Sequence, residues 1–293
     1  KDSVHKSIDE IDEREWNLLF SRFGSNEHQN LKELEQIFSG NEEIQNNWDI
    51  GYHLVRDPEG TIILASVYSL AVMKDDMLAS KEISAKLKEI RKEDPMYLTS
   101  KTVITGTPFT KGKSIYINYE SEDWREAVKI HVEMLQEIAE KEAASKLILR
   151  DFCSNQKSKL EAHLLELGLL DMELPKNCMI RDLNWETPEE LASKLGQKYR
   201  YSLRKEILKR ENQFVVNYNK PQTDAEKQFV FDLYRQVHQE STEISVFELP
   251  YSLFDRMYRD ESYDFINLYL KDEPDSPAAV LISQIIDGVY HAQ

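Results

Sequence analysis

Apolar residues recur along this chain at two spacings, three to four residues apart in some stretches and every second residue in others. The wider spacing predicts helices, which we expect within the first 40 residues and at 78–93, 123–145, 153–167, 187–212 and 224–240. Apolar, β-branched runs between them predict strands at 49–72, 97–106, 113–118, 146–152, 177–185, 213–219 and 264–293. This alternation predicts an α/β fold with layered helices and sheets, as opposed to a helical bundle or a β-sandwich.

Two stretches share the plan of a β-hairpin. The first reads YHLVRDPEGTIILASVYSL, where Pro58 and Gly60 take the second and last positions of a turn that begins at Asp57. The second, NLYLKDEPDSPAAVLISQI, repeats an aromatic-rich strand, an Asp/Pro turn and a strand of small and β-branched residues. The repetition favours an internal duplication.

The overall charge narrows the classes of partner. The 293 residues carry 53 acidic and 37 basic side chains, a formal net charge of -16, so the field of the whole molecule repels nucleic acid and anionic membranes. An anionic ligand must therefore be recognised locally. A length of 293 residues with 41% hydrophobic content suits one large domain or two of ordinary size.

The cysteines and the chain start bear on location. Cys153 and Cys178 have no C-x-x-C spacing, which favours free, packed thiols in a reducing compartment and hence a cytoplasmic protein. No run of 18 apolar residues is present, so we expect no membrane span. The start, KDSVHKSIDE, has neither a signal-peptide core nor an initiator Met, so the sequence is expected to be trimmed or part of a longer chain.

Positive charge concentrates in YRYSLRKEILKR, residues 199–210. Thr187, Pro188 and Glu190 form the N-terminal signature of the helix that leads into it. A helical wheel turns Leu195, Tyr199, Leu203 and Ile207 to the core, and spreads Lys194, Lys198, Tyr201, Arg204, Lys205 and Lys209 over the other side. Such a face can hold the phosphates of a nucleotide-bearing cofactor or of RNA. The alternative is a solvated face that balances nearby glutamates.

Two further stretches carry candidate chemistry. LILRDF places Arg150 and Asp151 at the end of an apolar strand, where ligands usually meet an open α/β sheet. Asp151 can act as a base for an amine or position a substrate, or the two residues can form a structural ion pair. TGTPFTKG offers the amide and hydroxyl of Thr107, or is an ordinary connection. Cys153 is expected to be a buried thiol and not a nucleophile.

Several motifs are missing from the sequence. It has no P-loop, no G-x-G-x-x-G, no H-E-x-x-H and no G-x-S-x-G, and its seven histidines lack metal-ligand spacing. We therefore expect no metal site and none of the enzyme classes that these motifs mark.

The order of the stretches NWDIGYHLVRDPEGTIILASVYSLAVM, VITGTPFTKGKSIYI, LILRDF and ELGLLDMELPKNCMIRDLNWETPEELASKLGQKYRYSLRKEILKRENQFVV resembles the Fem-like branch of the GNAT acyltransferase superfamily. The nearest resemblance is to peptidoglycan-biosynthesis and BioF2-like acetyltransferase domains. It rests most on the last stretch, through the segments Met179–Leu183, Thr187–Leu191, Arg200–Lys205 and Phe214–Val216.

The resemblance implies two GNAT-like halves with mixed, largely antiparallel sheets flanked by helices. The first half would span residues 1–185 and the second 186–293, the second being incomplete at its C-terminal end. It also implies transfer of an acyl or aminoacyl group from a carrier to an amine acceptor, with no metal. The pyrophosphate loop of ordinary GNAT enzymes is missing from both halves. The coiled-coil arm of the tRNA-dependent Fem enzymes is missing too, which favours acyl-CoA as the donor.

The same resemblance assigns expected roles. Asp151 would handle the proton of the attacking amine. The donor would be bound by Tyr201, Arg204, Lys205 and Lys209, and the acceptor substrate by Thr107, Arg150, Tyr290 and His291. Two other functions remain open, an aminoacyl-tRNA-dependent ligase of the Fem type and a non-catalytic GNAT-like binding module of a larger biosynthetic protein.

Overall fold

The computed structural model describes residues 1–20, 25–172, 184–241, 245–286 and 289–292. The chain forms two compact units. One comprises Lys1–Asp171, Tyr234–Arg259 and Ile286–Val289, and the other Met172–Leu233, Asp260–Ile285 and Tyr290–Gln293. The expected α/β class, with mixed, largely antiparallel sheets flanked by helices, is confirmed. No helix in the described part of the chain is long and apolar enough to cross a bilayer.

The sheet of the first unit has six strands. Its order is β1 (Asp2–His5), β2 (Asp49–Arg56), β3 (Ile62–Lys74), β4 (Thr99–Thr105) and β6 (Lys146–Ile148), and β5 (Ile115–Ile117) pairs with β3. All pairs are antiparallel except β4 with β6. The turn between β2 and β3 is the expected one, because the backbone N–H of Gly60 donates to Asp57 O at 3.2 Å.

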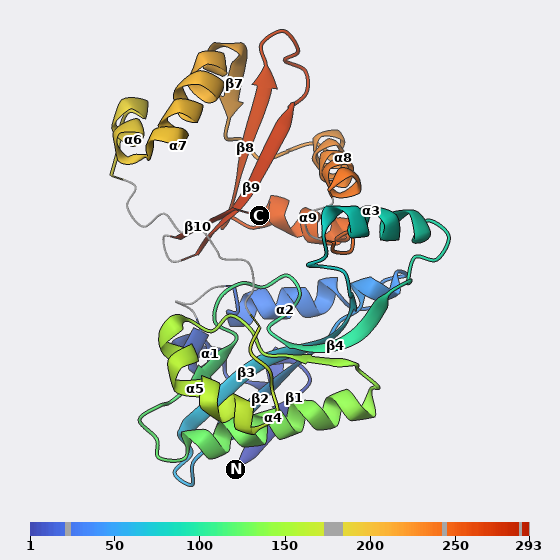
Figure 1. Ribbon diagram of the computed structural model, residues 1–293, viewed down its shortest axis with the longest axis vertical. Coiled ribbons are helices and arrows are strands. Elements are labelled where there is room, and N and C mark those ends of the chain that lie inside the picture. Colours follow the sequence, from blue (N-terminus) through green and yellow to red (C-terminus); the bar gives the residue numbers. More distant parts are fainter. Residues whose placement is uncertain (21–24, 173–183, 242–244, 287–288, 293) are drawn as a thin grey trace. The chain divides into compact units, whose positions relative to one another are not determined.

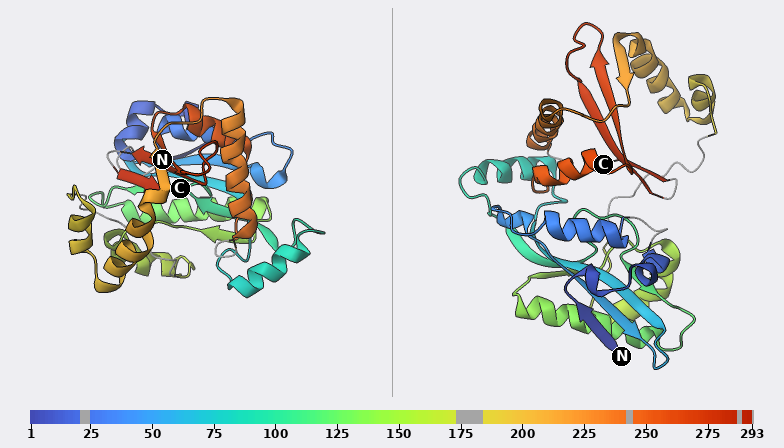
Figure 2. Two further views of the ribbon diagram at one scale, coloured as in Figure 1. Left: turned by 90° about the horizontal axis from the view of Figure 1, so that it is seen from above. Right: turned by 180° about the vertical axis from the view of Figure 1, so that it is seen from behind.

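Helices cover both faces of this sheet. α1 (Glu13–Phe20) and α2 (His28–Ile37) lie on one face and α4 (Trp124–Lys141) on the other (Figures 1 and 2). Alternate residues of β2 accordingly point to opposite layers. The hydroxyl of Tyr52 donates to Glu35 of α2 at 2.6 Å, while His53 meets His131 of α4. Trp16 and Phe20 of α1 and Leu31 and Leu34 of α2 are buried.

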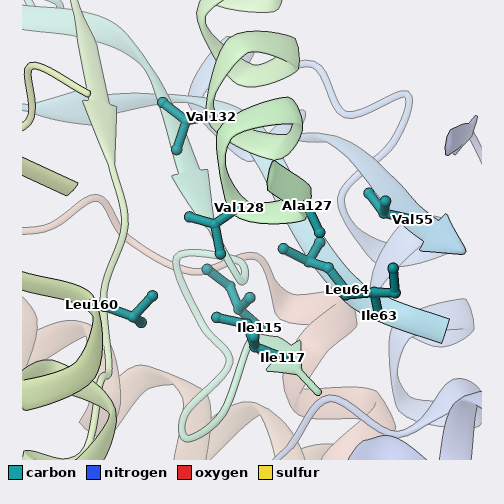
Figure 3. Close-up of a cluster of buried hydrophobic side chains, with 9 residues drawn as sticks. All are labelled: Val55, Ile63, Leu64, Ile115, Ile117, Ala127, Val128, Val132 and Leu160. Atoms are coloured by element: carbon teal, nitrogen blue, oxygen red, sulfur yellow. The ribbon is translucent and has the colours of Figure 1, made fainter. Parts of the chain in front are cut away.

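The core beneath α4 is shown in Figure 3, where Ala127, Val128 and Val132 face side chains of β3 and β5. The sequence favours an apolar face of Ala127, Ile130, Met134, Ile138 and Ala139 for this helix. Of these, Ala127 is buried, and the other four are partly buried and pack against two core clusters. The buried stripe of α4 consists of Ala127, Val128, His131, Val132 and Leu135.

The remaining elements of the N-terminal part are short. They are η1 (Ile8–Glu10), η2 (Ile44–Asn46), α3 (Lys81–Ile90) and α5 (Ser154–Glu166). Gly168 follows α5 with φ of 86°, as expected of a residue that ends a helix. Most of the strand expected at 177–185, including Cys178, lies outside the described residues.

Two C-terminal helices, α8 (Asp224–Glu240) and α9 (Tyr251–Arg259), return the chain to the first unit. Arg256 of α9 is buried and donates to Glu33 and, at 2.6 Å, to Asn30 of α2. Lys88 of α3 donates to the carbonyls of Gln239 and Ser241 at the end of α8. Polar contacts therefore hold residues 234–259 against the N-terminal part of the same compact unit.

The second sheet repeats the plan of the first. Its order is β10 (Val289–Ala292), β9 (Ala279–Ile286), β8 (Tyr263–Leu270) and β7 (Phe214–Asn217). In both sheets a first strand is followed in sequence by two α-helices and a pair of strands, and the first strand pairs antiparallel with the second. This repetition agrees with the duplication expected from the two hairpins.

Candidate functional site

A cluster of polar residues lies where β4 and β6 end, at the parallel pair of the first sheet. Arg150 directly follows β6, and its side chain turns to the loop after β4. Its Nε donates to Thr105 O at 3.2 Å, and its Nη2 donates to the carbonyls of Thr107 and, at 2.8 Å, Thr110. Its backbone N–H donates to the hydroxyl of Thr105 at 3.1 Å. One side chain therefore joins the two strand ends.

The loop around Arg150 is fixed by its own threonines and by a glycine. Thr107 and Thr110 are fully buried, and the backbone N–H of Thr107 donates to the hydroxyl of Thr110 at 2.9 Å. Gly106 has φ of 80°, and a Cβ at that position would lie 3.1 Å from Nη2 of Arg150. Glycine is thus required both by the backbone conformation and by the close approach of the guanidinium.

Asp151 completes the cluster. Its Oδ2 lies 2.8 Å from Nη1 of Arg150, and only 24% of its side chain is exposed. Burial raises the pKa of Asp151, and the neighbouring guanidinium opposes that shift without cancelling it. The residue has φ of 66°, a conformation that non-glycine residues rarely adopt and that often marks functional positions. The carboxylate is therefore held in one place, in a conformation that costs free energy.

Of the residues expected in a site, the structure brings together Thr107, Arg150 and Asp151. Arg150 was expected to bind substrate, yet its Nε, Nη1 and Nη2 are all engaged by the chain itself. Burial also lowers its pKa, while the charge of Asp151 acts in the opposite direction. Asp151 is the group of this cluster with a carboxylate oxygen to offer a ligand.

The basic stretch of the sequence lies in the second unit and is not one helix. It consists of α6 (Pro188–Lys194), α7 (Gln197–Ser202), the π-helical turn η3 (Leu203–Ile207) and the 3₁₀ turn η4 (Leu208–Gln213). The cap is as expected, because Thr187 Oγ1 accepts from the N–H of Glu190 at 3.2 Å. The helix is interrupted at Leu195. The side chain of Arg200 spans this interruption by donating to the carbonyls of Ala192 and Leu195, each at 3.0 Å.

This break and the π turn change which side chains are buried. Of the four residues expected to face the core, Leu203 is buried, whereas Tyr199 and Ile207 are 66% and 59% exposed. The wheel failed because it assumed an uninterrupted period of 3.6 residues. Arg204, Lys205 and Lys209 are exposed as expected, together with Tyr201. A surface with cations and two exposed tyrosines results, on a π turn of the kind often found at functional sites.

Three other expectations concern single residues. Cys153 is exposed, so the prediction of a buried thiol was wrong. The residue is the N-cap of α5, and its backbone N–H donates to Oε1 of Gln156 at 3.3 Å. Tyr290 and His291 lie on β10, and Tyr290 is 41% exposed. Among the described residues no group of three or more His, Cys, Asp or Glu side chains is arranged to hold a metal ion.

No family model matches this sequence, and no curated protein matches it significantly. Among solved structures, a mutant of the BH1408 protein from Bacillus halodurans aligns at 13% identity over 61% of this chain and 99% of its own, with a TM-score of 0.35. FemX aligns at 12% identity over 89% of this chain, with a TM-score of 0.47. The chain spans 57% of the FemX length. At these scores the two likenesses carry nothing over to this chain, and the candidate site is defined by its own residues.

The sequence did not predict that Arg150 joins the two strand ends, or that Thr110 is one of its partners. Thr110 stands in the quoted loop TGTPFTKG, but only the fold shows that its carbonyl accepts from a guanidinium 40 residues later. It also missed two buried histidines, His53 and His131, because no spacing in the sequence connects them.

Proposed function

We propose that this chain is an N-acyltransferase that moves an acyl group from acyl-CoA to an amine acceptor by direct attack of the amine. The observation that carries the proposal is Asp151, a half-buried carboxylate with positive φ, fixed by Arg150 at the end of a parallel strand pair. Ligands of open α/β sheets bind at such carboxyl ends of strands.

Asp151 is suited to proton transfer. An amine that attacks a thioester carbonyl forms a new C–N bond, loses a proton and expels the thiol. A carboxylate within hydrogen-bond reach can accept that proton, and a pKa raised toward the working pH makes it a better base. Arg150 acts as a positioning residue, since it contacts both Asp151 and the loop through Nε, Nη1 and Nη2.

The exposed basic surface of the second unit is the proposed site for the donor phosphates. Arg204, Lys205 and Lys209 offer charge-assisted donors, and Tyr201 offers a ring for stacking. Tyr290 and His291, on β10 of the same unit, remain candidate substrate-binding residues from their place in the sequence. The whole-chain charge of -16 makes such a local cationic surface necessary for any anionic donor.

Two observations favour other functions. Exposed Tyr199 and Tyr201 among cations also suit stacking of RNA bases, which would make the donor an aminoacyl-tRNA, as in a Fem-type ligase. The chain itself contacts Nε, Nη1 and Nη2 of Arg150, which suits a non-catalytic binding module.

Calorimetric titration separates these functions. The protein is titrated with acetyl-CoA, a long-chain acyl-CoA and their 3′-dephospho analogues, and with deacylated tRNA, at about 50 and 200 mM salt. Tighter binding of acyl-CoA than of the dephospho analogue supports the proposal. Binding of tRNA alone, with steep salt dependence, supports the ligase, and no binding at millimolar ligand supports the module.

A further inference from the structure

Two buried histidines face each other between β2 and α4. Nδ1 of His53 lies 2.9 Å from Nδ1 of His131, and the side chains are 0% and 1% exposed. The ring centroids are 5.2 Å apart and the ring planes differ by 17°. These values place the two nitrogens in line between nearly coplanar rings, which is the geometry of a direct N–H···N hydrogen bond.

Such a bond requires different tautomers in the two neutral rings, because one Nδ1 must donate and the other accept. The accepting ring carries its proton on Nε2. Both Nε2 atoms are buried without a hydrogen-bond partner, but Nε2 of His53 lies 3.7 Å from the carboxylate oxygen Oδ2 of Asp2, which favours a proton on that nitrogen. His131 then donates from Nδ1 and keeps a bare Nε2 in the core.

Few charges surround this pair. On β1, the carboxylate of Asp2 favours protonation of His53 and His5 opposes it. On β3, the residue opposite His53 is the uncharged Ser66. On α4, Lys129 and Glu133 pair with each other at the surface, 3.9 Å apart. Asp2 is therefore the anion that acts on the pair, and its own side chain is 54% exposed.

We propose that the His53–His131 pair is a pH-sensitive latch, which holds α4 on the sheet while both rings are neutral and releases it on mild acidification. The pair joins the middle of α4 to the centre of β2, next to the cluster formed by Val55, Val128 and Val132. One turn later, Leu135 of α4 packs in the cluster that contains Leu147 and Leu149. Release of α4 therefore also loosens β6, which leads into Arg150 and Asp151.

The direction follows from proton linkage. Burial lowers the pKa of His53 and holds that of His131 well below the ordinary histidine value. Above about pH 6.5 the histidines are neutral in the folded and the unfolded chain, and the full stability is present. As the pH falls below that value, the unfolded chain binds protons that the folded pair excludes. Stability is then lost, by up to tenfold in the folding constant per excluded proton and pH unit.

The test replaces the pair by His53→Leu with His131→Leu, which removes both proton sites and keeps the volume apolar. Urea unfolding is measured between pH 8 and pH 5.5. We expect the wild type to lose roughly tenfold to hundredfold more in its folding constant than the double variant over that range. The control His163→Gln, on α5, should lose as much as the wild type. Equal losses in wild type and double variant would overturn the proposal.

A measurement on the wild type keeps the test independent of how the variant folds. Histidine C2–H resonances are followed by NMR, and amide exchange of residues 124–141 is compared with that of 28–37 at pH 7.5 and 5.5. The latch requires His131 to stay neutral in the folded protein and exchange to accelerate in α4 more than in α2. Titration of His131 near pH 6.5 without loss of α4 protection would contradict it.

Discussion

Asp151 lies 2.8 Å from the guanidinium of Arg150, its immediate neighbour in the chain, and that guanidinium also donates to three carbonyls at the end of β4 and in the loop after it. Neighbouring residues of an extended strand point to opposite sides. The positive φ of Asp151 breaks that alternation and lets both side chains meet. The strain is thus the local cost of placing a carboxylate beside the buried cation.

Replacing Asp151 by Asn tests its role in proton transfer. In the wild type the transfer rate should fall on the acid side at a higher pH than for an ordinary carboxylate, because burial raises the pKa of Asp151. In Asp151→Asn that acid limb should vanish, and the rate should drop about 10²- to 10⁴-fold. The measurement is the pH profile of acyl transfer. Asp171→Asn, which removes only a surface ion pair with Lys157, is the control and should keep the wild-type profile.

Arg150→Lys tests whether the hydrogen bonds of the Arg150 guanidinium hold the two strand ends together. Lysine keeps the charge but cannot reach three carbonyls and a carboxylate at once, so buried acceptors lose their donor. We expect the free energy of unfolding to fall by about 2–4 kcal/mol, measured by urea denaturation. Arg204→Lys, at an exposed position, should change it by less than about 0.5 kcal/mol. A loss as small for Arg150→Lys would mean that the hydrogen bonds of Arg150 do not hold the strand ends together.

Gly106→Ala and Gly40→Ala form a matched pair. Both glycines have positive φ, 80° and 70°, but a Cβ on Gly40 meets nothing within 4 Å, whereas one on Gly106 meets Arg150 and Thr110. Gly40→Ala should cost about 1 kcal/mol from backbone strain alone. Gly106→Ala should cost about 2–3 kcal/mol, because the guanidinium must also shift. Thermal or urea unfolding measures the loss of stability in both variants. Equal losses would show that the loop after β4 can shift to accommodate the added methyl group without cost.

The features that the sequence predicted correctly are those set by residues close to one another along the chain. The turn at Asp57–Gly60 and the cap at Thr187 needed only local backbone preferences, and both are present. The apolar face that the sequence favours for α4 includes Ala127 but omits His131, which is also buried. A helical wheel counts a histidine as polar. Here, however, His131 is buried and forms a hydrogen bond with His53, which is 78 residues away in the sequence.

The site was harder to predict because it depends on contacts between distant parts of the chain. Arg150 and Asp151 were found from their place after a strand, but whether Arg150 binds a ligand or its own loop depends on how closely Thr107 and Thr110 approach. The basic stretch was found from composition alone. Its break at Leu195 and its π turn were not, since hydrophobic spacing cannot report a change of helical type.

The basic surface is tested by replacing Arg204, Lys205 and Lys209 together with Ala. If these side chains hold donor phosphates, affinity for acyl-CoA should weaken by roughly 10- to 100-fold and depend less on salt, because charge-assisted contacts are lost. Replacing Lys81, Lys86 and Lys92, in and beside α3, removes the same number of charges elsewhere and should leave affinity nearly unchanged. Equal losses of acyl-CoA affinity in the two triple variants would mean that the basic surface acts only through the net charge of the protein. An unchanged affinity in the first would assign it no part in donor binding.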